Sequence, residues 1–194
     1  MSGINSVCVY CGASGGADRR YMQSAVETGR AAARRGLRLV FGGGHVGLMG
    51  AMADAALAAG GVVEGVIPQA LMDRELSHEG VTRLHVVSSM HARKQKMFDL
   101  ADAFLALPGG VGTLDETIEV ITWKQLGMHD KPIVILDLDG YWEPLLTLID
   151  TVIARGFAPA ATARLFDVAA TVEDAFNLFE RAARPALHPD SARF

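Results

Sequence analysis

The segment over residues 103–124 constrains the fold more than any other part of the chain. It begins with a short apolar run, Ala103–Leu107, which has the length and character of a buried parallel strand. A glycine-rich turn, Pro108–Thr113, follows, and then a helix with Asp115 and Glu116 near its expected start. In such a unit, glycines let the backbone approach an anion, and the first N–H groups of the helix point at it. The segment therefore predicts a phosphate site.

The two carboxylates beside this turn have two possible explanations. Acidic residues in the first turn of a helix are favoured by the helix dipole alone, and we favour that explanation for Asp115. A site that binds a phosphorylated sugar and also reacts at the sugar needs an acid, and we assign that role to Glu116. The glycine spacing matches neither the dinucleotide fingerprint nor the Walker loop. The residues alone thus indicate phosphate and leave the reaction open.

Apolar runs and helical stretches alternate along the rest of the chain. Strands are expected over residues 4–10, 37–41, 62–67, 83–87, 103–107, 133–138 and 166–169, and helices over 18–35, 48–59, 90–100, 114–126, 141–155 and 172–183. This order predicts an α/β fold. We expect a single Rossmann-like domain over residues 1–184, with a parallel sheet flanked by helices, and a C-terminal tail over 185–194. Residues 68–80 are expected to form an irregular loop over the cleft.

Two further glycine-rich turns follow the first and second expected strands. The first turn contains Ser14, and the second contains Gly43 and Gly44. The triple glycine of the second turn could serve only to permit a tight turn. Because the carboxyl ends of parallel strands meet at one edge of a sheet, we favour the interpretation that these two turns form a nucleotide-sized cleft. The helix over 90–100 begins with cations, Arg93 among them, which its dipole disfavours. An anionic ligand would compensate for that placement.

Composition excludes several classes of protein. The 194 residues suit one domain with a substantial core, and the net charge of −4 argues against nucleic acid as a partner. No apolar run reaches the roughly 18 residues of a membrane span, and the N-terminus lacks a signal-peptide pattern. Cys8 and Cys11 are read as core or loop residues of a cytoplasmic protein. The six histidines have no partners at ligand spacing, so no metal is predicted. Since half of the residues are hydrophobic, a buried subunit interface is expected.

The candidate catalytic groups of this chain are carboxylates and cations. No Gly-x-Ser-x-Gly elbow is present, and the cysteines lack a nearby base. Arginine grips phosphate in a bidentate way, and glutamate can activate water or stabilise the oxocarbenium-like transition state of glycoside hydrolysis. A phosphate-binding site with a carboxylate beside it is suited to cleavage of the glycosidic bond of a sugar phosphate.

Two motifs carry a resemblance to a known family. The run Pro108–Glu116, PGGVGTLDE, resembles the PGGxGTxxE signature of the Lonely Guy (LOG) family of cytokinin-activating phosphoribohydrolases, and Met90–Lys94 resembles its second motif. The resemblance covers about Val7 to Ala183. It implies a Rossmann-like fold, a homodimer, and hydrolysis of N6-modified adenosine 5′-monophosphates to free base and ribose 5-phosphate. No metal or redox cofactor is expected, and the charge and the apolar runs predict neither nucleic acid nor membrane as a partner. Many members carry the label of lysine decarboxylase. This sequence does not support that label, because none of its lysines lies in a recognisable pyridoxal phosphate setting.

Carried over by position, the resemblance implies that Arg93 and Glu116 are catalytic. The substrate-binding residues that it implies are Ser14, Gly43, Gly44, Glu75, Lys94, Gly109, Gly110, Val111, Gly112, Thr113, Leu114, Asp115 and Thr122. Two alternatives stay open at this point. One is an AMP nucleosidase with an unmodified substrate, and the other is a nucleotide- or cofactor-binding carrier without catalysis.

Overall fold

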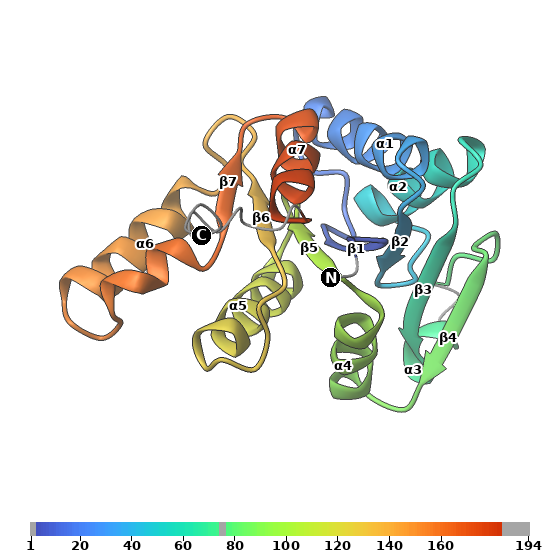
Figure 1. The fold of residues 1–194 in the computed structure, drawn as a ribbon. Coiled ribbons are helices and arrows are strands. Elements are labelled where there is room, and N and C mark those ends of the chain that lie inside the picture. Colours follow the sequence, from blue (N-terminus) through green and yellow to red (C-terminus); the bar gives the residue numbers. More distant parts are fainter. Residues whose placement is uncertain (1–2, 74–76, 184–194) are drawn as a thin grey trace, which may run out of the picture.

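Seven parallel strands form one sheet in a computed structural model that describes residues 3–73 and 77–183. The strand order is β4-β3-β2-β1-β5-β6-β7 (Figure 1). The strands are β1 (Ser6–Tyr10), β2 (Arg38–Phe41), β3 (Val63–Pro68), β4 (Arg83–Val87), β5 (Ala103–Ala106), β6 (Ile133–Leu136) and β7 (Asp167–Ala169). Every neighbouring pair is parallel, so the predicted α/β fold with a parallel sheet is confirmed.

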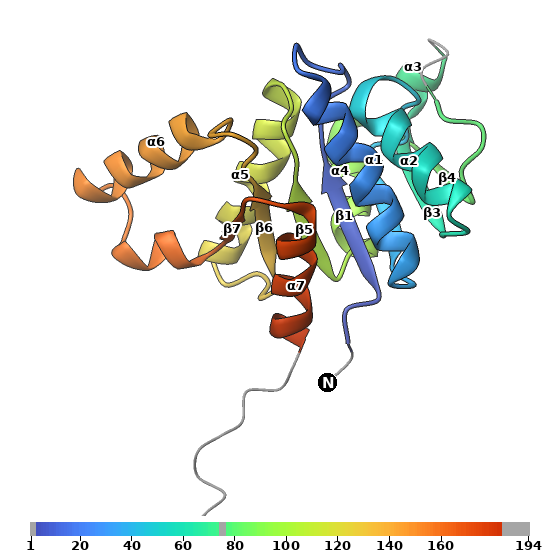
Figure 2. The same cartoon turned by 90° about the horizontal axis from the view of Figure 1, so that it is seen from above.

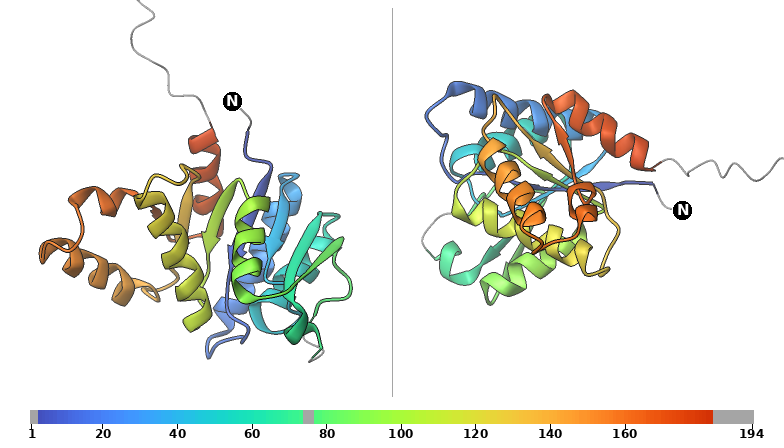
Figure 3. Two further views of the ribbon diagram at one scale, coloured as in Figure 1. Left: turned by 90° about the horizontal axis from the view of Figure 1, so that it is seen from below. Right: turned by 90° about the vertical axis from the view of Figure 1, so that its left-hand side faces the viewer.

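Helices cover both faces of this sheet. They are α1 (Arg19–Arg34), α2 (Gly47–Ala58), α3 (Gln69–Met72), α4 (Met90–Leu100), α5 (Val111–Gln125), α6 (Glu143–Ala154) and α7 (Val172–Ala183), with a 3₁₀ helix η1 (Ala160–Arg164). Figure 2 shows α1, α2 and α7 over one face, and Figure 3 shows α4 and α5 over the other. Helix α6 extends from the side of the molecule. None of the helices in the described ranges is long and apolar enough to cross a membrane.

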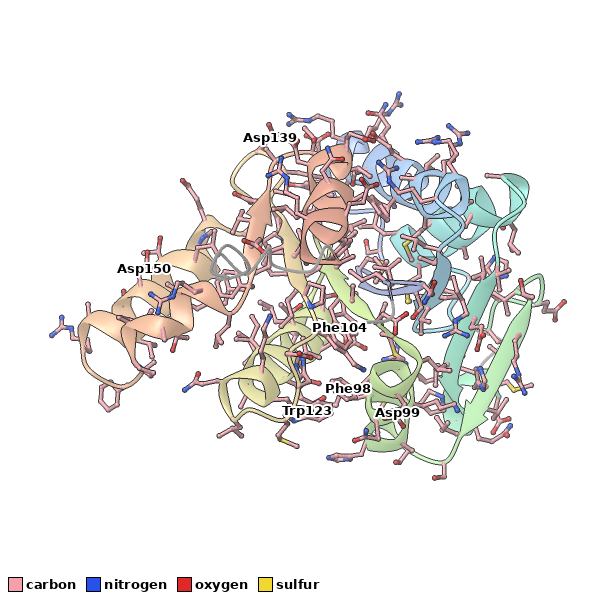
Figure 4. All side chains as sticks on the ribbon, in the orientation of Figure 1. Phe98, Asp99, Phe104, Trp123, Asp139 and Asp150 are labelled. Atoms are coloured by element: carbon pink, nitrogen blue, oxygen red, sulfur yellow. The ribbon has the colours of Figure 1, made fainter. Side chains whose placement is uncertain are left out.

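The alternation of side chains in the strands explains why both faces are buried. In β1, Val7 and Val9 pack with α1, α2 and α7, whereas Cys8 packs on the opposite side with α4 and α5. Because helices cover both faces, a parallel strand is expected to be apolar throughout. Figure 4 shows two aromatic residues on the α4–α5 side, Phe98 of α4 and Phe104 of β5, whose stacked rings lie 5.7 Å apart. The prediction that Cys8 is a core residue is confirmed.

Helix α5 begins three residues earlier than the sequence indicated. Gly110 is the N-cap, and its carbonyl accepts the N–H of Leu114 at 3.1 Å, so the helix starts at Val111. The first turn is therefore free of acid, and the prediction that Asp115 and Glu116 lie in it is wrong. Because the dipole acts mainly within the first turn, it does not explain the presence of Glu116.

Other boundaries also differ from expectation. The predicted loop over 68–80 contains the end of β3 and the short helix α3. Strand β6 ends at Leu136, and the chain then turns sharply, because an Asp137 carboxylate oxygen accepts the N–H of Trp142 at 2.7 Å. Asp139 adopts a left-handed conformation in this turn, with φ of 51°. Glu75 and the predicted tail over 185–194 lie outside the described residues.

The strand order places a switch point between β1 and β5. From β1 the chain proceeds to β2 on one side, and from β5 it proceeds to β6 on the other. Such a divergence opens a crevice at the carboxyl ends of the strands, where ligands of α/β proteins bind. The loops there are tied together, since Gly12 N–H donates to the Pro108 carbonyl and Leu48 N–H to the Gly12 carbonyl, each at 3.1 Å.

Candidate active site

A cavity of about 380 Å³ lies at this switch point. The loops after β1, β2 and β5 and the starts of α4 and α5 contribute to its wall. Its lining residues are Cys11, Ala13, Gly42, Gly44, Val46, Met49, Ile67, Leu71, Arg93, Gly110, Gly112, Thr113 and Glu116. The two residues that the sequence analysis assigned to catalysis thus meet in one cavity.

Arg93 and Glu116 form a buried ion pair. Arg93 Nη1 donates to Glu116 Oε1 at 2.7 Å, and each side chain is only 10% exposed. The other guanidinium nitrogens donate to backbone carbonyls, Nε to Val66 at 3.1 Å and Nη2 to Gly42 at 3.3 Å. Each of the three guanidinium nitrogens therefore donates a hydrogen bond to another group of the protein. In this geometry Arg93 fixes the position of Glu116.

Two glycines are required by the close packing around this pair. A Cβ on Gly42 would lie 1.8 Å from Arg93 Nη2, so a side chain there would displace the guanidinium. A Cβ on Gly109 would lie 2.1 Å from Thr113 Oγ1, at the start of α5. The glycine-rich turns therefore serve two purposes: they let the backbone reach a ligand, and they make room for the site's own side chains.

The environment of Glu116 sets its protonation. Burial raises the pKa of Glu116 above the ordinary glutamate range, and the charge and hydrogen bond of Arg93 oppose that rise. A carboxyl group with a raised pKa is closer to the working range of a general acid or base. Burial also raises the pKa of the Cys11 thiol, so this cavity residue stays protonated and is a poor nucleophile.

The N-terminus of α5 provides N–H groups that can bind an anion in the cavity. The first N–H groups of a helix have no partner within it, and here they belong to Val111, Gly112 and Thr113. Gly112 and Thr113 line the cavity together with Glu116. Since Gly112 and Glu116 are four residues apart, they lie on the same side of the helix. An anion held by the helix start is thus placed next to the buried carboxylate.

Several predicted site residues lie outside this cavity. Lys94 Nζ pairs with Asp115 and with Glu119, each at 3.0 Å, so it joins α4 to α5. Thr122 is exposed, and its hydroxyl donates to the Ile118 carbonyl at 2.8 Å. The structure does not bring Lys94, Asp115 or Thr122 to the cavity wall.

The remaining predicted residues surround the cavity at different depths. The Gly43 carbonyl accepts the N–H of His78 at 2.8 Å, and Val111 is 82% exposed. Leu114 packs against an apolar cluster that contains Trp142. Ser14 and Gly109 line a second, adjacent cavity. Gly44, Gly110, Gly112 and Thr113 line the main cavity as predicted.

Sequence reasoning missed the apolar wall of the cavity. Met49, Ile67 and Leu71 line it together with the polar groups of the site. Ile67 lies near the carboxyl end of β3, so the edge rule for parallel sheets would have identified it. No group of metal-ligating side chains occurs within residues 3–73 and 77–183.

Known proteins resemble this chain in sequence and in fold. A family model described as "Possible lysine decarboxylase" matches residues 49–179. The "Cytokinin riboside 5′-monophosphate phosphoribohydrolase LOG" of Oryza sativa subsp. japonica is 46% identical over 173 residues, which are 89% of this chain and 72% of that protein. The "Cytokinin riboside 5′-monophosphate phosphoribohydrolase" of Rhodococcoides fascians is 50% identical over 171 residues, 88% of this chain and 86% of the relative.

Solved structures share the fold. The molybdenum cofactor binding protein of Rippkaea orientalis superposes with a TM-score of 0.72 at 21% identity, covering 95% of this chain and 99% of the other. The molybdenum cofactor carrier protein of Chlamydomonas reinhardtii gives a TM-score of 0.69 at 25% identity, covering 91% and 96%. The sequence matches, which extend over most of the chain, show that it belongs to the LOG family of cytokinin riboside 5′-monophosphate phosphoribohydrolases.

Proposed function

We propose that this protein hydrolyses the N-glycosidic bond of N6-modified adenosine 5′-monophosphates, releasing the free base, a cytokinin, and ribose 5-phosphate. The names of its relatives support this activity. The observation that carries the proposal is the buried Arg93–Glu116 pair beside the start of α5. A carboxylate at this position is suited to a reaction at the sugar of a ligand whose phosphate the helix holds.

The cavity accommodates the three parts of such a nucleotide. The 5′-phosphate lies at the N–H groups of α5, and the ribose lies next to Glu116. The base lies along the apolar wall that contains Met49 and Ile67. Glu116 stabilises the positive charge that develops at C1′, or activates the attacking water. Water adds to C1′, the bond from C1′ to the base breaks, and the proton released from water ends on the base. Arg93 holds Glu116 in place and favours its ionised form.

The lysine decarboxylase description of the family model finds no support in this site. Lys94 pairs with acidic residues, Lys124 donates to the Lys131 carbonyl, and Lys131 donates to the Phe98 carbonyl. Lys96, the remaining lysine of the chain, lies on α4, and none of the four lines the cavity. Amine chemistry through a lysine therefore has no place in the proposed reaction.

Chromatography of incubated nucleotides tests the activity. We would incubate the protein with isopentenyladenosine 5′-monophosphate, with AMP, and with the two corresponding nucleosides. We expect free base from both monophosphates, with the N6-modified one reacting faster. Faster reaction of AMP would favour the AMP nucleosidase. Nucleotide binding without any release of base would favour the carrier, since the similar solved structures are those of molybdenum cofactor binding and carrier proteins.

A homodimer is part of the proposal. Every residue of α6 is at least partly exposed although most of them are apolar, and Leu148 is 58% exposed. Phe157 is 86% exposed beyond the helix, and Leu126 and Met128 at the end of α5 are 68% and 65% exposed. A second copy of the chain would bury such surfaces. A cytoplasmic location is also proposed, supported by the buried, unpaired thiols of Cys8 and Cys11.

A further inference from the structure

The hydroxyl of Tyr141 donates a hydrogen bond to the carbonyl oxygen of Gly109. Tyr141 belongs to the turn between β6 and α6, so this bond joins a fourth loop to the three that form the site. Tyr141 lines a cavity of about 470 Å³ together with Ser14, Tyr21 and Gly110. Ala13 and Gly110 line both this cavity and the one that holds Arg93 and Glu116, so the two cavities adjoin.

The bond to Gly109 fixes the orientation of the next N–H group. A trans peptide unit is planar, and its C=O and N–H bonds point in opposite directions. No cis peptide bond occurs among the described residues. Because the Gly109 carbonyl is directed at Tyr141, the N–H of Gly110 is directed away from Tyr141. The main cavity borders Gly110, and the start of α5 follows at once.

A peptide between two glycines needs such an external restraint. Glycine occupies both signs of φ readily, so a Gly-Gly peptide rotates with little steric resistance. The residues around Tyr141 are themselves held in place. Trp142 N–H donates to Asp137, and Asp139 pairs with Arg20 of α1. The rings of Tyr141 and Tyr21 pack in a T-shaped arrangement with their centroids 5.5 Å apart. Figure 4 labels Asp139 in the same turn.

We infer that Tyr141 is a positioning residue that holds the Gly109–Gly110 peptide with the Gly110 N–H toward the phosphate of the ligand. This inference rests on the proposed function, since it assigns the phosphate to the start of α5. Tyr141 acts through the backbone and does not touch the reacting atoms. Its contribution is therefore to the binding of phosphate-bearing ligands and not to the chemical step.

The test compares Tyr141→Phe with the matched variant Tyr21→Phe. Both substitutions remove one hydroxyl and keep the ring, and no hydrogen bond from the Tyr21 hydroxyl is present in the described part of the chain. Calorimetry would measure the binding of ribose 5-phosphate and of adenosine to each protein. Thermal unfolding would confirm that both variants are folded.

We expect Tyr141→Phe to weaken the binding of ribose 5-phosphate by about 3- to 10-fold, the net value of one hydrogen bond. Binding of adenosine should be unchanged, and Tyr21→Phe should match the wild type for both ligands. For the nucleotide substrate, KM should rise while kcat stays within about two-fold. Wild-type affinity of Tyr141→Phe for ribose 5-phosphate, or an equal loss for adenosine, would overturn the inference. Failure of the proposed function would appear differently, as no release of base by the wild-type protein.

Discussion

Replacing Arg93 with methionine leaves Glu116 buried without a cation beside it. Both side chains are 10% exposed, so the pair is largely shielded from water. Removing one partner of a buried pair costs about 3–5 kcal/mol, because the other charge stays behind. Protonation of Glu116 lowers the free energy cost of leaving it buried, and burial already raises its pKa. The carbonyls of Val66 and Gly42 also lose a donor, at about 1 kcal/mol each. We therefore expect a loss of about 3–5 kcal/mol.

Urea unfolding, followed by circular dichroism, measures this loss. The matched control is Lys94→Met on the same helix, whose partners Asp115 and Glu119 are 57% and 24% exposed, and we expect it to cost about 1 kcal/mol. In the double variant Arg93→Met with Glu116→Gln, the cost should fall below the sum of the single costs by about 1–3 kcal/mol. Equal losses for Arg93→Met and Lys94→Met, or additive costs in the double variant, would refute the view that a buried pair organises the site.

Three further predictions concern activity and assembly. Below its raised pKa Glu116 is protonated and loses its charge, so kcat should fall on the acid side of a pH–rate profile at a higher pH than for an ordinary glutamate. Because Arg93 opposes the rise in the pKa of Glu116, Arg93→Met should move this acidic fall in kcat to still higher pH. A shift to lower pH would contradict the assignment. The kcat/KM for adenosine should be far below that for AMP in the base-release assay, because the nucleoside has no phosphate for the start of α5 to bind, and equal values would exclude a phosphate site at α5. Leu148→Glu and Phe157→Glu should convert the dimer to a monomer in light scattering, whereas a monomeric wild-type protein would exclude the dimer.

The arrangement of the sheet could be predicted because its signals are local. Apolar runs such as Ala103–Leu107, separated by helical stretches, identify parallel strands without knowledge of their neighbours. The sequence singled out Arg93 as a cation disfavoured by its own helix dipole and Glu116 as an acid beside a phosphate loop, and it predicted an anionic ligand as the compensating partner of the cation. The two residues proved to be partners of each other.

Other parts of the site depend on contacts between distant segments. The sequence did not reveal that Lys94 pairs with Asp115, 21 residues away, instead of lining the cavity. It gave no sign that Tyr141 bonds to Gly109 across 32 residues. The start of α5 at Val111 was missed because glycine is a poor helix former, and only the tertiary structure compensates for its presence in the first turn.

The most direct test of the proposed role of Glu116 is the rate of base release by Glu116→Gln. This change keeps the size of the side chain and removes its charge, and glutamine still accepts a hydrogen bond from Arg93. We predict that turnover of isopentenyladenosine 5′-monophosphate falls by roughly 10²–10⁴-fold, the range for loss of a positioned acid–base group. Calorimetric binding of ribose 5-phosphate should change little, because backbone N–H groups hold the phosphate. Full turnover in a folded Glu116→Gln protein would contradict the account, since the cavity would then bind nucleotides without using its buried carboxylate for catalysis.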